Sequence, residues 1–203
     1  MIELLKKIIP ENFKKMLIKV LLSKKKEFIL TSHQRKQEII LEYKYKYGCD
    51  ILIETGTYLG DMVFAQLNKF KKIYSIELGV ELFEKAKERF KDNHDVSILQ
   101  GDSGNVLPEL IEEINEPIIF WLDGHYSSGI TALGEKECPI YEELKSILLS
   151  SHKYNHVILV DDARCFIGKN DYPTIKELYT YVTQENERYN ISVQEYIIRL
   201  TIR

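Results

Sequence analysis

Cysteine is scarce in this chain of 203 residues, which contains only Cys49, Cys138 and Cys165. None of them forms a CxxC pair, and their irregular spacing indicates a reducing compartment and argues against a zinc site. Long apolar runs are also missing, since no stretch approaches the roughly 20 residues that cross a bilayer. Pro10 and the charged residues around it interrupt the apolar start before a signal-peptide core can form. We therefore expect a cytoplasmic protein.

The sequence also lacks internal repeats and low-complexity segments, and its length suits a single domain with a proper core. Its hydrophobic content of 44% and charged content of 29% are typical of soluble globular proteins. The charge is uneven, because residues 1–48 carry +7 and the remainder carries −10. An acidic main body disfavours nucleic acid as the substrate.

Residues 1–48 are predicted to form a basic, helical N-terminal extension. Apolar residues recur at helical spacing between positions 13 and 21, and a second helix is expected from Ser32 to Tyr45, ended by Gly48. One interpretation packs the first helix on the main domain with its lysines in water. The other gives residues 1–26 a contact with a membrane surface or a partner, and the amphipathic arm is compatible with a homodimer.

From residue 49 to 203, segments with strand character alternate with segments of helical periodicity. This alternation predicts an α/β domain with a doubly wound, mostly parallel sheet. The end of the chain is β-rich without an obvious hairpin turn, so it fits one long strand or a bent pair. The expected strands cover 51–53, 73–76, 96–100, 118–122 and 157–160, and the expected helices cover 63–70, 81–90, 103–114, 141–149 and 173–186.

Each of the five expected strands runs into an acidic residue. These acids are Glu54, Glu77, Asp102, Asp123 and the pair Asp161-Asp162. In open α/β folds, ligands bind in the crevice outside the carboxyl ends of the strands. The regular placement of the acids therefore predicts a functional site along that edge.

The first strand is followed by the loop Glu54-Thr55-Gly56-Thr57-Tyr58-Leu59-Gly60. Gly56 allows a tight turn and close approach to a ligand, and Gly60 lets the next helix pack near the loop. The pattern is not G-x-G-x-x-G, because Thr57 and Tyr58 fill places where a pyrophosphate requires bare backbone. A ligand without phosphates fits better than NAD, although an ordinary tight turn is the alternative.

The next two acids strengthen the ligand interpretation. Glu77 ends the second strand, where a carboxylate can accept two hydrogen bonds from a ribose diol. Asp102 and Ser103 follow the third strand. Asp102 either accepts from an exocyclic amine or simply caps the next helix.

With these elements in this order, residues 50–162 resemble the class I S-adenosylmethionine-dependent methyltransferases. Glu54-x-Gly56-x-x-x-Gly60 resembles their first motif, although Thr57 or Tyr58 stands where a second glycine is common. The resemblance implies a seven-stranded sheet whose last strand is antiparallel. It also implies S-adenosylmethionine as the cofactor, bound by Glu54, Gly56, Thr57, Tyr58, Gly60, Glu77, Asp102, Ser103 and Asp123.

Asp123, Asp161 and Asp162 form a second group if the fourth and fifth strands are neighbours, because neighbouring strands lie about 5 Å apart. Carboxylates that close raise one another's pKa unless a cation neutralises them. Oxygen ligands favour Mg²⁺, Mn²⁺ or Ca²⁺ over zinc, with Mg²⁺ as our expectation here. A turn or a helix cap is the simpler interpretation of each acid taken alone.

This second group resembles the metal ligands of the macrocin and novobiocin-sugar O-methyltransferases and of their relative, cephalosporin hydroxylase. The resemblance implies that Asp123, Asp161 and Asp162 hold a divalent metal. That family often has an acidic general base where this chain has His125, and histidine accepts a proton near neutral pH. His125 and Asp123 are therefore the expected catalytic residues.

The sequence thus predicts a methyltransferase that methylates a hydroxyl of a small molecule, plausibly a sugar or glycan precursor, with help from a metal ion. One alternative is a hydroxylase-type reaction on the same site. Another is a non-catalytic module that binds the cofactor and uses its basic N-terminal arm to contact a partner or membrane.

Overall fold

A computed structural model describes residues 31–124 and 138–203 of the chain. The expected helix near residues 13–21, the expected membrane-contact segment 1–26 and His125 lie outside the described residues. The predictions made for them therefore remain predictions.

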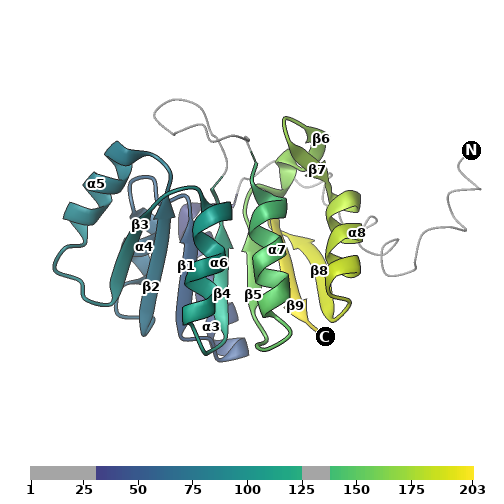
Figure 1. The fold of residues 1–203 in the computed structure, drawn as a ribbon, viewed down its shortest axis with the longest axis horizontal. Helices are drawn as coiled ribbons and strands as arrows, with labels where there is room; N and C mark the ends of the chain where they lie inside the picture. Colours follow the sequence, from purple (N-terminus) through teal and green to yellow (C-terminus); the bar gives the residue numbers. More distant parts are fainter. Residues whose placement is uncertain (1–30, 125–137) are drawn as a thin grey trace, which may run out of the picture.

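A seven-stranded sheet forms the centre of the fold, in the order β3-β2-β1-β4-β5-β9-β8 (Figure 1). The first five strands pair in parallel, whereas β9 pairs antiparallel with both β5 and β8. This arrangement confirms the predicted doubly wound, mostly parallel sheet. The strands are β1 (Ile51–Thr55), β2 (Lys72–Glu77), β3 (Val96–Gln100), β4 (Ile118–Leu122), β5 (Val157–Val160), β8 (Tyr189–Gln194) and β9 (Ile197–Ile202).

Helices cover both faces of the sheet and enclose two hydrophobic clusters (Figure 1). Alternate residues of one strand serve opposite clusters: Phe120 of β4 packs with α6, α7 and α8, whereas Trp121 packs with α3 and α4. The strands at the centre are buried on both faces, as expected of a parallel sheet. The helices are α3 (His33–Tyr47), α4 (Asp61–Gln66), α5 (Val80–Arg89), α6 (Ser103–Glu113), α7 (Ile140–Ser150) and α8 (Ile175–Glu185).

One helix differs from the sequence expectation. The helix after β1 ends early, at Gln66, because Leu67 leaves the helical conformation with a ψ of 140° and Asn68 has a φ of +60°. Phe64, expected on the apolar face, is 59% exposed. Helix α6 follows the expected range and contains Pro108 in its interior. The Asp102 side chain fixes the start of that helix at Ser103, which leaves the proline more than one turn inside.

The β-rich end of the chain is a hairpin, which decides between the two interpretations of that segment. Strands β8 and β9 are joined by Glu195 and Tyr196, whose φ angles are +52° and +56°. Such a turn normally contains Asn or Gly, so Glu195 and Tyr196 do not predict a hairpin from the sequence. A second small hairpin, β6 (Ile167–Lys169) with β7 (Tyr172–Thr174), turns at Asn170 and Asp171 with positive φ and follows the short 3₁₀ helix η1 (Ala163–Cys165).

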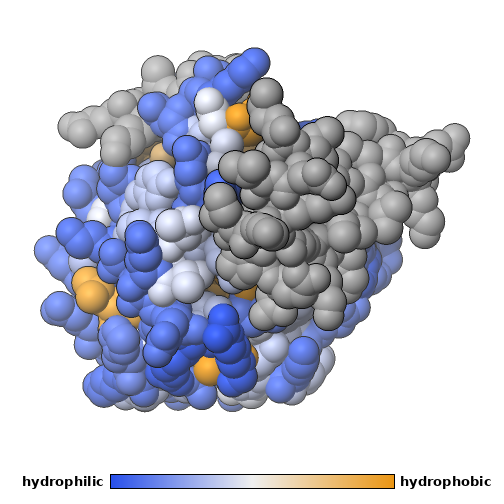
Figure 2. Space-filling model, turned by 90° about the vertical axis from the view of Figure 1, so that its right-hand side faces the viewer, coloured by the Kyte–Doolittle hydropathy of each residue, from blue (hydrophilic) through white to orange (hydrophobic). Residues whose placement is uncertain are grey.

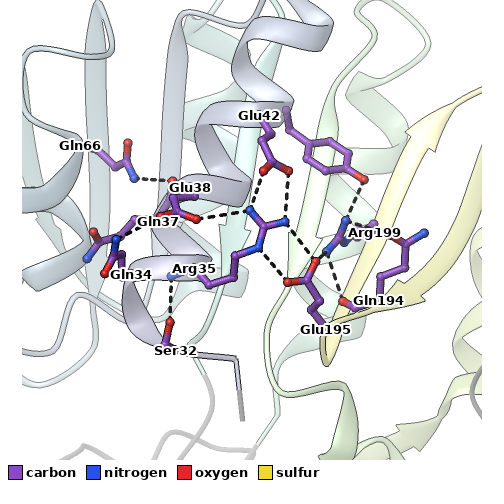
Figure 3. Close-up of polar contacts among 11 residues, drawn as sticks. Ser32, Gln34, Arg35, Gln37, Glu38, Glu42, Gln66, Gln194, Glu195 and Arg199 are labelled. Carbon is purple, nitrogen blue, oxygen red and sulfur yellow. Dashed lines mark hydrogen bonds and ion pairs between the residues drawn. The ribbon is translucent and has the colours of Figure 1, made fainter. Parts of the chain in front are cut away.

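Helix α3, from the predicted N-terminal extension, packs directly on the sheet. Ser32 caps its start, Gly48 ends it at a φ of +65°, and Ile39 and Ile40 are completely buried. Its first turn is joined to the β8–β9 turn by Arg35, whose Nε lies 2.8 Å from Glu195 Oε2 (Figure 3).

The described surface is hydrophilic at the end of the molecule that carries β8 and α8, with only separate hydrophobic spots (Figure 2). Among residues 31–124 and 138–203, none of the helices has the length and apolar character that crossing a membrane requires.

Candidate active site at the carboxyl ends of the strands

The strand register brings the predicted site residues to one edge of the sheet. Thr55 pairs with Ile76 on one side and with Leu122 on the other, and Leu122 pairs with Val160. Backbone hydrogen bonds continue past these pairs, from Asp123 N to Thr55 O at 3.1 Å and from Asp161 N to Leu122 O at 3.0 Å. The acids at the carboxyl ends of β1, β2, β4 and β5 therefore lie along a common edge of the sheet.

Only glycine fits at position 56 in the loop after β1. Its φ is +83°, and a Cβ placed on it would lie 2.5 Å from the backbone oxygen of Asp123. Gly60 has a similar constraint, because its Cβ would lie 2.7 Å from the Phe90 ring. Both glycines keep the loop against its neighbours, and Gly56 joins the end of β1 to the end of β4.

Glu54 is buried beneath this loop, with 3% of its surface exposed. Ser75 Oγ donates to Glu54 Oε2 at 2.5 Å, and Ser75 Oγ lies 2.6 Å from Thr57 Oγ1. Burial raises the pKa of Glu54 to about 8, against the lowering effect of the Ser75 hydrogen bond. At neutral pH Glu54 is therefore largely protonated.

The Glu77 carboxylate accepts hydrogen bonds from the loop after β1 and from the backbone just after β2. Its Oε2 accepts a hydrogen bond from Tyr58 N, and its Oε1 accepts one from Gly79 N, each at 2.8 Å. A carboxylate has about four acceptor positions, so further hydrogen bonds remain available. Glu77 thus stabilises the loop and keeps the capacity to accept from a ribose diol.

Asp102 is a helix cap, in agreement with the simpler of its two sequence interpretations. Its Oδ1 accepts from Gly104 N at 2.8 Å at the start of α6. The neighbouring Ser103 donates to Glu143 Oε1 on α7 at 2.7 Å. A cap oxygen retains free acceptor positions, so the cap does not decide the predicted adenine contact of Asp102.

Glu143 was not predicted from the sequence, although it is only 2% exposed at this edge. Burial raises its pKa to about 7, and its hydrogen bond from Ser103 opposes that rise. A signal was present, because Glu143 lies between Ile140, Leu144 and Ile147 on the apolar face of an amphipathic helix. An acid at such a position is buried and needs a polar partner.

Asp123, Asp161 and Asp162 come together at the ends of β4 and β5. Asp161 is almost fully buried, and its Oδ1 accepts from Asp162 N at 2.8 Å. Asp162 has a φ of +48° and lies 3.2 Å from the Arg164 guanidinium. Burial and the charge of Asp161 raise the pKa of Asp123 well above its usual range.

Lys36 of α3 supplies a positive charge to this group. Its Nζ forms an ion pair with Asp161 Oδ2. Burial lowers the pKa of Lys36, but the charges of Asp161, Asp123 and Asp162 outweigh burial, so its pKa is raised overall. Nothing in the sequence distinguishes this lysine from the others in the basic segment.

The predicted divalent metal can be tested against this arrangement. Oxygen donors suit Mg²⁺, but Lys36 holds Asp161 Oδ2 and Arg164 holds Asp162. Within the part of the chain that the structure describes, no three Asp, Glu, His or Cys side chains form a group that could hold a metal ion. The side-chain arrangement does not fit a metal ion, and no chemical step is assigned to one.

Comparison with known proteins adds to this geometry. None of the protein-family models searched matches the chain. A probable ribosomal RNA small subunit methyltransferase A from Methanococcoides burtonii is 33% identical over 84 residues. That match covers 37% of this chain and 31% of the relative, so it spans about a third of the relative's length.

Solved structures of methyltransferases share the fold across most of the chain. The S-adenosylhomocysteine-bound methyltransferase PaMTH1 of Podospora anserina is 15% identical, covering 96% of this chain and 89% of its own, with a TM-score of 0.60. The Bacillus cereus O-methyltransferase, also with S-adenosylhomocysteine, is 12% identical over 98% and 94% of the two chains, with a TM-score of 0.58. The 23S rRNA methyltransferase ErmE is 12% identical over 86% and 70%, with a TM-score of 0.54. The chain therefore has the Rossmann-like fold of the S-adenosylmethionine-dependent methyltransferases.

Proposed function

We propose that this chain is an S-adenosylmethionine-dependent methyltransferase that methylates a hydroxyl group of a small molecule. The carrying observation is the shared edge on which Gly56 packs directly against Asp123. This contact puts the loop proposed for the cofactor beside the acids proposed for the acceptor. Methyl transfer needs that proximity, because it joins two bound molecules in line.

On the cofactor side, Gly56 and its loop approach the amino-acid portion, with Thr57, Tyr58 and Gly60 shaping the loop. Glu77 accepts from the ribose diol through the acceptor positions left over from its two backbone hydrogen bonds. Asp102 and Ser103 face the adenine. Glu54 lies beneath the loop, where the positive charges of S-adenosylmethionine would favour its ionised form.

On the acceptor side, Asp123 and its neighbours orient the hydroxyl. The hydroxyl oxygen attacks the methyl carbon, the bond from that carbon to sulfur breaks, and the hydroxyl proton passes to a base. We propose His125 or Asp123 as that base. Metal assistance, which the family resemblance implies, is not part of this proposal, because Lys36 and Arg164 already pair with Asp161 and Asp162.

Calorimetric titration with S-adenosylhomocysteine tests the cofactor half of the proposal. We expect one molecule bound per chain, with affinity lowered at least about tenfold in Glu77→Gln, which weakens the ribose contacts. The absence of binding by a folded protein would overturn the assignment. Transfer of labelled methyl from S-adenosylmethionine to a panel of sugars and other hydroxyl compounds then tests the reaction.

RNA is a second candidate acceptor, favoured by the match to the probable ribosomal RNA methyltransferase. The charge of −10 on residues 49–203 argues against it, since RNA binding is dominated by phosphate contacts. Ribosomal RNA belongs in the same labelling panel, at two salt concentrations. Methylated RNA would decide for this candidate, and methylated small molecules alone would decide against it.

A further inference from the structure

The charge balance of the acceptor side depends on α3. Asp161 at the end of β5 is almost fully buried, and a carboxylate at that depth is stabilised by a nearby cation. The described structure provides Lys36, which is 125 positions from Asp161 in the sequence. Helix α3 thereby contributes a side chain to the group of acids at the ends of β4 and β5.

The position of Lys36 is fixed by the residues around it. Ser32 accepts from Arg35 N at the start of α3, and Arg35 binds Glu195 through two nitrogens (Figure 3). Glu195 is held in turn by Arg199, at 3.2 Å. The turn of helix that carries Lys36 is therefore anchored to the β8–β9 hairpin independently of Asp161.

A second ion pair on the same helix differs from the Lys36 pair in the exposure of its acidic side chain. Lys44, whose side chain is 11% exposed, pairs with Asp50, but the Asp50 side chain is 58% exposed, so the difference lies in the acid. The Asp161 side chain is only 2% exposed, and that of Lys36 is 21% exposed. A pair at this depth is weakly screened by water, whereas a surface pair contributes little. Lys36 therefore faces the buried acids of the site.

We propose that Lys36 is the resident cation of the acceptor side and occupies the place at Asp161 that a divalent metal ion would need. This inference rests on the proposed function, which assigns the acceptor to Asp123, Asp161 and Asp162. The ammonium group has three donors. One binds Asp161, and the others are suited to an acceptor hydroxyl whose oxygen gains negative charge as its proton leaves.

The test is Mn²⁺ binding by the full chain saturated with S-adenosylhomocysteine, measured by calorimetry and by the electron paramagnetic resonance signal of the free ion. We compare wild type, Lys36→Met, Lys36→Arg and the double variant Lys36→Met with Asp161→Asn. Lys36→Met should bind Mn²⁺ at least about tenfold more tightly than wild type, because the carboxylates are released for oxygen-loving cations. The double variant should lose that gain, and Lys36→Arg should bind as weakly as wild type.

Lys44→Met is the matched control, since it removes the same charge from the same helix away from the acids, and its Mn²⁺ affinity should equal that of wild type. Lys36→Gln replaces Lys36→Met if the latter does not fold. Equal Mn²⁺ affinity in wild type and Lys36→Met would overturn the proposal, and so would binding by neither. Failure to bind S-adenosylhomocysteine is a separate result that would overturn the proposed function, since Mn²⁺ titration can be repeated without it.

Discussion

The two halves of the sheet edge at the carboxyl ends of the strands hold their acids by different means. Beside β1, β2 and β3, the acids are bound by neutral donors: Ser75 for Glu54, backbone N–H groups for Glu77 and Asp102, and Ser103 for Glu143. Beside β4 and β5, cations bind the acids, with Lys36 at Asp161 and Arg164 at Asp162. Among residues 31–124 and 138–203, the side-chain partners found for the acids of the first half are neutral, and in the proposed function the cofactor supplies positive charge there. The second half already contains its own.

The largest expected effect is at the contact that joins the two halves. Gly56→Ala should lower S-adenosylhomocysteine affinity by more than about 100-fold, because the added Cβ would collide with backbone and the left-handed conformation costs roughly 1–2 kcal/mol more. Calorimetry gives the affinity and circular dichroism reports folding. Gly48→Ala is the control: it has a φ of +65° but nothing within 4 Å of the added Cβ, so it should bind normally.

In the half beside β4 and β5, loss of one charge should lower the free energy of unfolding more than loss of a charge at the surface does. Asp161→Asn leaves Lys36 without its buried partner and should lower the free energy of unfolding by about 3 kcal/mol. Asp50→Asn removes the partner of Lys44 from an exposed position and should cost less than about 1 kcal/mol. Urea denaturation measures both. Equal costs would mean that the Lys36 pair is no more buried in solution than a surface pair.

In the half beside β1, β2 and β3, the stability of the protein should depend on pH, because a buried acid there keeps its proton. Glu54 has a pKa of about 8, above its ordinary value of 4.5, so the folded protein keeps a proton that the unfolded chain releases. Stability should therefore fall as pH rises from about 5 to 8, by an amount on the order of 3 kcal/mol. Glu143, with a pKa of about 7, adds to the fall over a narrower range.

Glu54→Gln should flatten this decline, as measured by urea denaturation at several pH values. Glu195 provides a contrast, because its hydrogen bond with Arg35 lowers its pKa. Its contribution to stability is present above the ordinary pKa and is lost as pH falls below it. An unchanged slope in Glu54→Gln would show that Glu54 is ionised in the folded protein.

The smallest expected effect separates capping from cofactor binding at Asp102. Asp102→Ala should cost about 1 kcal/mol of stability through loss of the α6 cap, and Ser32→Ala should cost a similar amount at α3. Only Asp102→Ala should also lower S-adenosylhomocysteine affinity, by about tenfold. Equal affinities in the two variants would leave Asp102 with the cap alone.

Much of this fold was predictable because the sheet is built from short apolar runs with an acid after each. The five parallel strands and the helices between them follow from periodicity, and the edge of acids follows from the parallel arrangement. The β8–β9 hairpin was harder, since Glu195 and Tyr196 adopt positive φ without Gly or Asn. There the pairing of β9 with β5 prevails over local preference.

The sequence predicts a site residue only where the same short segment determines both where that residue lies in the fold and what its side chain does. Glu54 and Gly56 belong to one strand and its loop, so their roles could be inferred together. Lys36 reaches the site through the packing of α3, a tertiary contact that periodicity does not encode. The sequence predicted a divalent metal at Asp123, Asp161 and Asp162, whereas the described structure pairs Asp161 with Lys36 from another part of the chain.

The bridge from Arg35 to Glu195 spans 160 positions of the sequence. A contact between residues this far apart in the sequence requires a large loop to close before the contact can stabilise the fold, so it forms late in folding. During synthesis, residue 35 leaves the ribosome long before the hairpin that anchors it. The bridge that fixes the first turn of α3 beside Asp161 therefore forms only once the β8–β9 hairpin has been made, which couples the final position of Lys36 to that hairpin.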